Sequence, residues 1–159
     1  DIFFVGDDYG GKNGMLMSPA LWRALIKPQV ARLYALAGEY GVHMMQHSCG
    51  SIRPVIGDLI ELGLEVLDPV QIAAADMNPE GLKAEFGDRL TFHGGVNTED
   101  TLPFGTPADV FRETRYLMDT LGDGGGYVVC GSQYLQADIP IANVIAMYQA
   151  AGSISPEIS

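Results

Sequence analysis

The sequence predicts an α/β fold in which about five βα units form a parallel sheet. Short apolar runs alternate along the 159 residues with longer stretches whose apolar residues recur at helical spacing. The composition, 47% hydrophobic and 18% charged, is that of a globular protein with a sizeable core. No linker or low-complexity tract separates the units, so residues 1–159 are expected to form one domain.

Five apolar runs are expected to be the strands, at residues 2–5, 42–46, 65–67, 90–92 and 127–129. Helices are expected between them, and three begin with a capping residue followed by proline: Ser18-Pro19, Asn78-Pro79 and Thr106-Pro107. Pro28 is expected to end the first helix and to start a second one that runs to about residue 38. A last helix is expected over about residues 140–151.

The helix after residue 50 is expected to bury one face, because its apolar residues recur at i, i+3, i+4, i+7 and i+8: Ile52, Val55, Ile56, Leu59 and Ile60. Gly63 can end this helix in the left-handed conformation. In a later helix, Asp109 lies three residues after Thr106, where a capping box requires an acid.

The charge and the cysteine content exclude several classes of partner. A formal net charge of −11 and a pI near 4.4, with no local Lys/Arg cluster, argue against binding to nucleic acid or to an anionic membrane. No apolar run reaches the roughly 18 residues of a membrane helix. The two cysteines are far apart and form no disulfide framework, so a cytoplasmic location with free thiols is expected.

The stretches that follow the five predicted strands are polar or rich in glycine, and they read "GDDYGG", "QHSCG", "DPVQ", "HGGVNTED" and "CGSQ". In parallel α/β folds the loops after the strand C-termini build the functional site. Polar, glycine-rich loops are also common without any such role. We expect six side chains from these stretches to gather at one end of the sheet: Asp8, His47, Cys49, Gln71, Asn97 and Cys130.

A histidine and a cysteine lie two residues apart in the second of these stretches. If the strand continues to Cys49, the alternation of side chains places His47 and Cys49 on one face at the rim of the sheet. The two side chains could then share one tetrahedral Zn²⁺, with donor atoms within about 4 Å of each other. The alternative is a partly buried thiol beside a hydrogen-bonded histidine, without a metal. His43 has the same parity but is expected to be a core histidine.

Zinc requires at least one further protein ligand, and four residues in neighbouring stretches are candidates: Cys130, Asp7, Asp8 and His93. Zinc keeps a coordinated thiol deprotonated near neutral pH, and a thiolate attacks an activated methyl group. Asp8 and Gln71 are the expected catalytic residues, with the role of orienting the substrate. For Asp7 and Asp8 a role as solvated loop acids is an equal alternative.

Three stretches, "HSCGSIRPVIGDLIELGLEVLDPVQ", "LKAEFGDRLTFHGGVNTEDTLPFGTPADV" and "GGGYVVCGSQYLQADIPIANVIAMYQAA", resemble the C-terminal half of the uroporphyrinogen decarboxylase (URO-D) superfamily. The likeness extends from "VGDDYGG" to "AMYQAA". Members are TIM barrels of roughly twice this length, so the resemblance implies a partial (βα) barrel of the TIM type without its first strands and helices. Exposed edges of a parallel sheet are adhesive, so a homo-oligomer is expected.

The superfamily contains uroporphyrinogen decarboxylase itself and zinc-dependent methyltransferases that work with corrinoid proteins or coenzyme M. In the methyltransferase branch an H-x-C pair and a distant cysteine hold zinc, which implies His47, Cys49 and Cys130 as metal ligands. The family's later ligand falls near Ser132 or Gln133, two or three residues beyond Cys130. The implied function is zinc-dependent methyl transfer from a methylated donor or a corrinoid protein to a small-molecule thiol.

Two alternatives remain open. Uroporphyrinogen decarboxylases need no metal, and they hold the substrate carboxylates with arginines and an aspartate that lie mainly in the half of the fold absent here. Their C-terminal histidine also falls near Ser132 and Gln133, where this sequence has none. The other alternative is a fragment that holds half of a site and has no activity. Zinc titration separates methyl transfer from decarboxylation, and turnover by the longer chain tests the fragment hypothesis.

Overall fold

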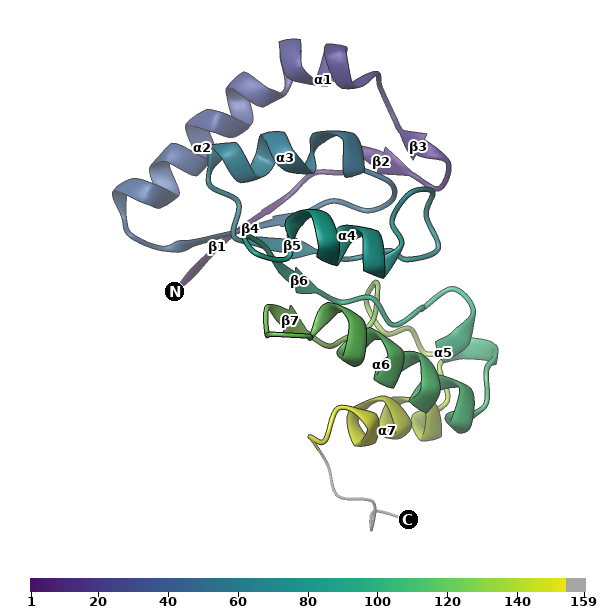
Figure 1. Cartoon of the computed structure of the whole chain (residues 1–159). Coiled ribbons are helices and arrows are strands. Elements are labelled where there is room, and N and C mark those ends of the chain that lie inside the picture. Colours follow the sequence, from purple (N-terminus) through teal and green to yellow (C-terminus); the bar gives the residue numbers. More distant parts are fainter. Residues whose placement is uncertain (154–159) are drawn as a thin grey trace.

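Five parallel strands form one sheet, with the order β1-β4-β5-β6-β7, in a computed structural model that describes residues 1–153 (Figure 1). Their bounds are Ile2–Gly6 (β1), His43–His47 (β4), Val66–Asp68 (β5), Thr91–His93 (β6) and Tyr127–Val128 (β7). At least one helix separates each of these strands from the next along the chain. The predicted α/β fold of about five parallel βα units is therefore confirmed.

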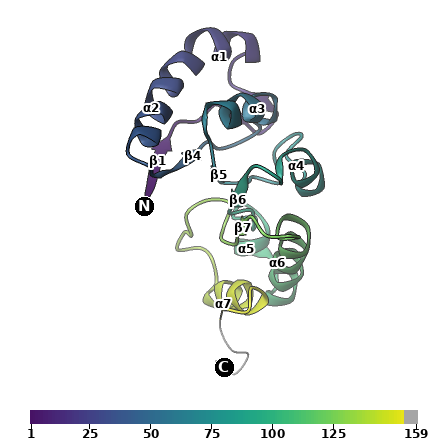
Figure 2. The ribbon, with the colours of Figure 1, turned by 60° about the vertical axis from the view of Figure 1, so that its left-hand side comes forward.

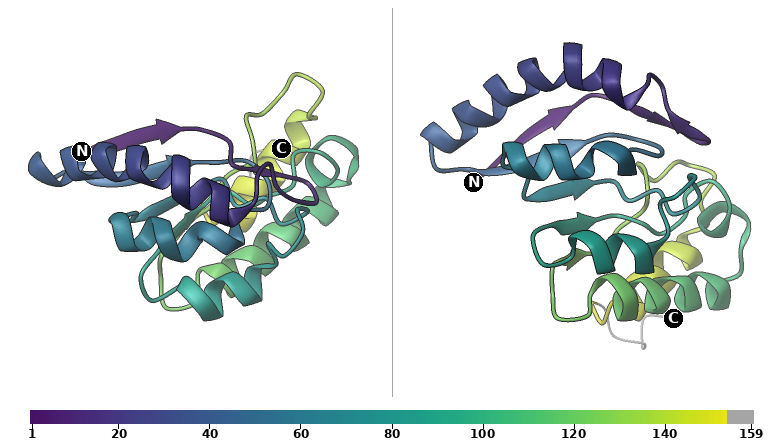
Figure 3. Two further views of the ribbon diagram at one scale, coloured as in Figure 1. Left: turned by 90° about the horizontal axis from the view of Figure 1, so that it is seen from above. Right: turned by 45° about the horizontal axis from the view of Figure 1, so that its top comes forward.

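Seven helices occur in the described part of the chain: Pro19–Leu25 (α1), Lys27–Glu39 (α2), Arg53–Leu62 (α3), Pro79–Phe86 (α4), Thr101–Phe104 (α5), Pro107–Leu121 (α6) and Ile141–Ala150 (α7). They form an arc along one side of the sheet (Figure 2), and they follow one another in chain order in the right-hand view of Figure 3. Neighbours in this arc pack together, including α2 with α3, α4 with α6, and α6 with α7.

The alternation of side chains along β4 distinguishes the two faces of the sheet. Met44 and Gln46 are buried on one face, whereas Met45 and His47 are half-buried and line a pocket on the other. Gln46 lies at the helix-covered face, where its Oε1 accepts a hydrogen bond of 3.0 Å from the hydroxyl of Tyr34 in α2. The largest fully buried side chains include Trp22, Ile56, Leu59, Leu67, Leu82, Phe92 and Leu117. This core leaves the opposite face free for polar chemistry.

The predicted helix boundaries agree with the structure. The Ser18 hydroxyl accepts from the Leu21 N–H, and Thr106 and Asp109 form a complete capping box at the start of α6. Gly63 ends α3 with φ at +110°, in the left-handed region that favours glycine. Local capping chemistry thus sets these boundaries without help from the rest of the fold.

Two expectations differ from the structure. His43 is not a core histidine: 67% of its side chain is exposed, and its Nδ1 lies 2.7 Å from Glu65 Oε2. It has the parity of His47 but stands at the opposite end of β4, where its side chain is exposed to solvent. The strand also stops at His47 instead of continuing to Cys49. The Ser48 N–H still donates to the carbonyl of Asp68, but the chain then turns.

Two small elements follow β1 that the sequence analysis did not predict. They are the strands Gly10–Gly11 (β2) and Gly14–Met15 (β3), which pair as an antiparallel hairpin. None of the helices in residues 1–153 is long and apolar enough to span a membrane.

Candidate functional site

The loops after β1 and β4 pack tightly enough to bring Asp8 to Cys49. A Cβ atom at Gly10 would lie 2.7 Å from the Cys49 carbonyl oxygen, and one at Gly50 would lie 2.6 Å from the Gly10 carbonyl carbon. The Ser48 side chain adds a hydrogen bond of 2.9 Å from the Tyr9 N–H. Both glycines are therefore required for this approach, and Gly50 also has φ at +75°.

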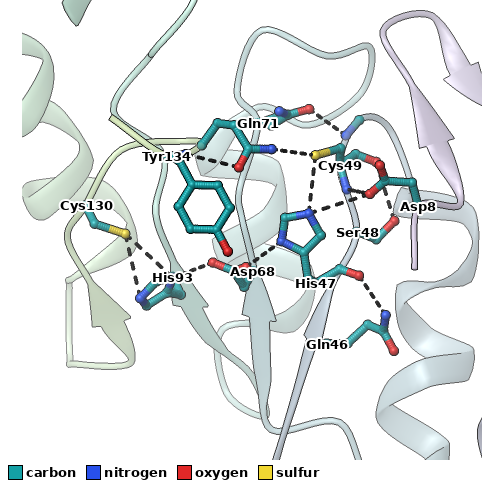
Figure 4. A network of polar contacts seen from close by, with 12 residues as sticks. Asp8, Gln46, His47, Ser48, Cys49, Asp68, Gln71, His93, Cys130 and Tyr134 are labelled. Atoms are coloured by element: carbon teal, nitrogen blue, oxygen red, sulfur yellow. Dashed lines mark hydrogen bonds and ion pairs between the residues drawn. The ribbon is translucent and has the colours of Figure 1, made fainter. Parts of the chain in front are cut away.

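His47 ends β4 with its two ring nitrogens facing different partners (Figure 4). Nδ1 lies 2.7 Å from Asp68 Oδ2, at the end of the neighbouring strand β5. Nε2 lies 3.4 Å from the Cys49 sulfur and 3.6 Å from Asp8 Oδ1. The Asp68 carboxylate holds the proton at Nδ1, which leaves the Nε2 lone pair directed at Cys49 and Asp8.

Cys49 has two polar neighbours besides His47. Its backbone N–H donates to Asp8 Oδ1 at 2.8 Å, and the Gln133 side-chain amide donates to its sulfur at 3.2 Å. Burial, followed by the negative charge of Asp8 and of Asp68, raises the pKa of the Cys49 thiol to about 11. Without a cation nearby, this thiol therefore stays protonated at neutral pH.

The donor atoms of Asp8, His47 and Cys49 all lie within 4.8 Å of one another. Carboxylate oxygen, imidazole nitrogen and thiolate sulfur are the zinc ligands used in proteins. Two ligands of one tetrahedral zinc, with bonds of about 2.0–2.3 Å, lie roughly 3.3–3.7 Å apart. The separations of 3.4 Å and 3.6 Å from His47 Nε2 fall in this range. The three residues therefore fit a zinc ion, with a fourth position left for another ligand.

Asp68 connects this cluster to a second histidine. Its Oδ1 lies 2.6 Å from Nδ1 of His93, at the end of β6. Burial alone would raise the pKa of Asp68, but the hydrogen bonds from His93 and His47 outweigh it and lower the pKa below its usual value. Asp68 is therefore an anion shared by two imidazole rings. Asp68 was not among the predicted site residues, although its place at the start of "DPVQ", directly after a predicted strand, was the available signal.

Cys130 lies with His93 and not with His47 and Cys49. Its sulfur is 3.6 Å from both ring nitrogens of His93. Among the described residues, the cluster that contains His47 and Cys49 has Asp8 as its third member, whereas Cys130 was predicted as the third ligand. The geometry thus favours Asp8 as the third ligand. Gln133, at the position where the resemblance places the family's later ligand, reaches the Cys49 sulfur through its amide.

The remaining predicted residues lie around a small pocket beside Cys49. Gln71 Oε1 accepts a hydrogen bond of 2.6 Å from the Gly50 N–H. Gln71 and Asn97 line a pocket of about 100 Å³ together with Cys49 and Lys12. Asp7 is not part of the three-residue cluster, and its N–H donates to the carbonyl of His47. Of the six side chains expected at one end of the sheet, Cys49, Gln71 and Asn97 line this pocket, His47 and Cys130 line a second one, and Asp8 lies beside Cys49.

The second pocket, of about 320 Å³, opens on the other side of His47. His47, Asp68, His93 and Cys130 provide its polar wall. The rest of its lining is mostly apolar or aromatic: Phe4, Met45, Pro69, Gly131, Gln133, Tyr134, Leu135, Met147 and Tyr148.

The sequence of residues 1–154 matches the family model described as uroporphyrinogen decarboxylase (URO-D). The chain belongs to the URO-D family. Since the match covers nearly the whole sequence, the predicted resemblance is confirmed. No curated protein matches the sequence at a significant level.

Among solved structures, this URO-D family chain is similar to a methyltransferase from Methanosarcina mazei, with a TM-score of 0.76 and 21% sequence identity. The similarity covers 96% of this chain and 42% of the methyltransferase, so the chain spans less than half the length of that structure. At this level of identity the likeness concerns the fold.

Proposed function

We propose that this URO-D family protein transfers a methyl group to a small-molecule thiol at a zinc site formed by His47, Cys49 and Asp8. The observation that carries the proposal is the spacing of the three donor atoms, which fits one tetrahedral ion. The similarity to a methyltransferase fold agrees with it. The methyl donor is a methylated small molecule or a corrinoid protein.

A zinc ion at this site, when bound, supplies the Lewis acidity that keeps an acceptor thiol deprotonated at neutral pH. The protein side chains provide the setting for that chemistry. Asp68 keeps the proton of His47 at Nδ1, so that Nε2 is available as a ligand. Gln133 donates to the Cys49 sulfur and disperses its negative charge.

Gln71 has a positioning role in this proposal. Its side-chain oxygen Oε1 accepts a hydrogen bond from the Gly50 N–H, which fixes the side chain on the wall of the small pocket beside Cys49. Asp8 holds the Cys49 backbone with the same oxygen that lies 3.6 Å from His47 Nε2. Asp8 thus both orders the loop and supplies a ligand.

Decarboxylation, the activity in the name of the family, is less well supported. A polycarboxylate substrate requires several basic side chains. Among the described residues that line the two pockets at this end of the sheet, Lys12 is the single Lys or Arg. A carboxylate substrate would also meet the negative charges of Asp8 and Asp68.

Metal analysis of the purified protein after metal-replete expression tests the proposal. We expect about one zinc per chain in the wild type, and loss of zinc and of methyl transfer in Cys49→Ala. Cys130→Ala is the matched control, because it removes the other thiol, which lies outside the cluster. Zinc retained in Cys49→Ala, or no zinc in the wild type, would contradict the proposal. Loss of zinc in Cys130→Ala would restore Cys130 as the third ligand.

A further inference from the structure

Cys130 and His93 form a pair that the proposed zinc site does not use. His93 ends β6 and Cys130 lies two residues after the neighbouring strand β7, and both are on the wall of the 320 Å³ pocket. Both side chains are partly exposed to this pocket, so a ligand can reach the sulfur. The pair is separate from the cluster of Asp8, His47 and Cys49.

The order of the groups is carboxylate, imidazole, thiol (Figure 4). Asp68 Oδ1 lies 2.6 Å from His93 Nδ1 and fixes the proton there. The Cys130 sulfur lies 3.6 Å from both ring nitrogens of the imidazole that Asp68 orients in this way. A nucleophilic cysteine requires this arrangement of a base oriented by a third group.

The charge of His93 agrees with the geometry. Its pKa is raised to about 10, first by the hydrogen bond to Asp68 and then by the contact with Cys130, while burial opposes the shift. At neutral pH the ring is therefore positively charged beside the sulfur, and a neighbouring positive charge favours a thiolate. The other titratable groups on this pocket are His47 from β4, Asp68 from β5, and Tyr134 and Tyr148 from the C-terminal segment.

We propose that Cys130, His93 and Asp68 form a second, nucleophilic site that reacts with a neutral electrophile carrying an apolar group. In the reaction the Cys130 sulfur, as a thiolate paired with the positively charged His93 ring, forms a bond to an electrophilic carbon. The bond from that carbon to its leaving group breaks, and the leaving group departs with the electron pair. No metal or redox partner is required.

The lining of the pocket defines the class of electrophile. Its described lining residues include no Lys or Arg, so an anionic group finds no fixed counter-charge there. Phe4, Met45, Leu135 and Tyr148 provide an apolar surface across from the polar wall. A molecule with an apolar body and an electrophilic carbon at one end matches a pocket that has one polar and one apolar wall.

Alkylation with iodoacetamide, followed by mass spectrometry of each cysteine peptide, tests the site at pH 6, 7 and 8. An ordinary thiol with a pKa of about 8.5 gains reactivity roughly 75-fold between pH 6 and 8. We expect the rate at Cys130 to rise less steeply than this between pH 6 and 8, because the positive charge of His93 beside the sulfur favours the thiolate.

His93→Gln should lower the rate at Cys130 at pH 7 by about tenfold. Without the charged ring less of the thiol is present as thiolate, and the higher nucleophilicity of a more basic thiolate offsets part of this loss. His43→Gln is the matched control, because it removes a histidine that also pairs with a carboxylate but lies at the other end of β4. It should leave the rate unchanged. N-benzyliodoacetamide should show saturation kinetics at Cys130, since its ring enters the pocket.

Two outcomes would overturn the proposal. One is a rate at wild-type Cys130 that rises with pH as for an ordinary thiol, a result that does not depend on whether a variant folds. The other is an equal effect of His93→Gln and His43→Gln. A rate at Cys130 that rises linearly with the concentration of N-benzyliodoacetamide, without saturation, would contradict the proposal that the electrophile carries an apolar group. None of these measurements involves zinc or a methyl donor, so the proposed function can fail while this site is confirmed, and the reverse.

Discussion

Among single residues, Asp68 has the widest influence on the site, because one carboxylate orients the histidines of both proposed centres. Its Oδ2 holds His47 and its Oδ1 holds His93. Such partners of a metal-ligating histidine fix the tautomer and the direction of the ring, and their loss typically costs 10–100-fold in metal affinity. In the proposed zinc site Asp68 is thus a positioning residue and not a ligand.

Asp68→Asn should therefore weaken zinc binding by about 10–100-fold without removing any ligand. Competition with a chelator of known affinity measures this change. Glu65→Gln is the control, because it disturbs an equivalent hydrogen bond of 2.7 Å to His43 at the far end of the same strands. Equal zinc affinity in Asp68→Asn and the wild type would show that His47 is oriented by other contacts.

Among the elements, the turn after β4 decides the geometry of the cluster of Asp8, His47 and Cys49. The chain leaves the strand at His47 and passes so close to the β1 loop that Gly10 and Gly50 lie against each other's backbone. This contact places Asp8 beside Cys49, although 41 positions separate them in the sequence. The hairpin β2–β3 extends the same loop, and its Gly11 carbonyl accepts from the Ser51 N–H.

Gly50→Ala should destabilise the protein by about 2–4 kcal/mol, from the left-handed backbone and from the clash with Gly10 and Gly11. Urea denaturation monitored by circular dichroism measures the difference. Gly57→Ala is the matched control: Gly57 lies within α3, and a Cβ there meets nothing within 4 Å. That substitution should instead stabilise the protein, by up to about 1 kcal/mol. Gly50→Ala with wild-type stability would show that the two loops can separate freely.

At the scale of the whole molecule, the five-stranded sheet formed by residues 1–153 has two unpaired edges, β1 and β7. Ile2 and Phe4 of β1 are 59% and 51% exposed, although both are large and apolar. An edge of this kind offers free backbone groups and apolar side chains to another strand. A closed eight-stranded barrel would have no such edges.

We therefore predict that this chain self-associates in solution. Size-exclusion chromatography with light scattering should give a mass above the 17.1 kDa of one chain. Replacing Ile2 and Phe4 with Lys should reduce the association, whereas Leu33→Lys on the exposed side of α2 should not. A monodisperse monomer at all concentrations would contradict the prediction.

The sequence by itself determined the succession of elements. Helix caps such as Ser18 and Thr106, and the left-handed stop at Gly63, act within a few residues, so local chemistry specifies them. The parallel arrangement also follows from the sequence, because βα units deliver their polar strand ends to one edge. This is why Asp8, His47, Cys49 and Gln71 could be named as neighbours before any coordinates were known.

Only the tertiary structure decided which of these neighbours share a site. Asp8 lies with His47 and Cys49 because of the close contact between two glycine loops, a feature that depends on strand register and loop path. The exposure of His43 and the double role of Asp68 depend in the same way on which strand lies alongside. The position of a residue along a strand fixes the face of the sheet on which its side chain lies. The residues that the side chain contacts come from other strands and loops, and long-range packing decides where these lie.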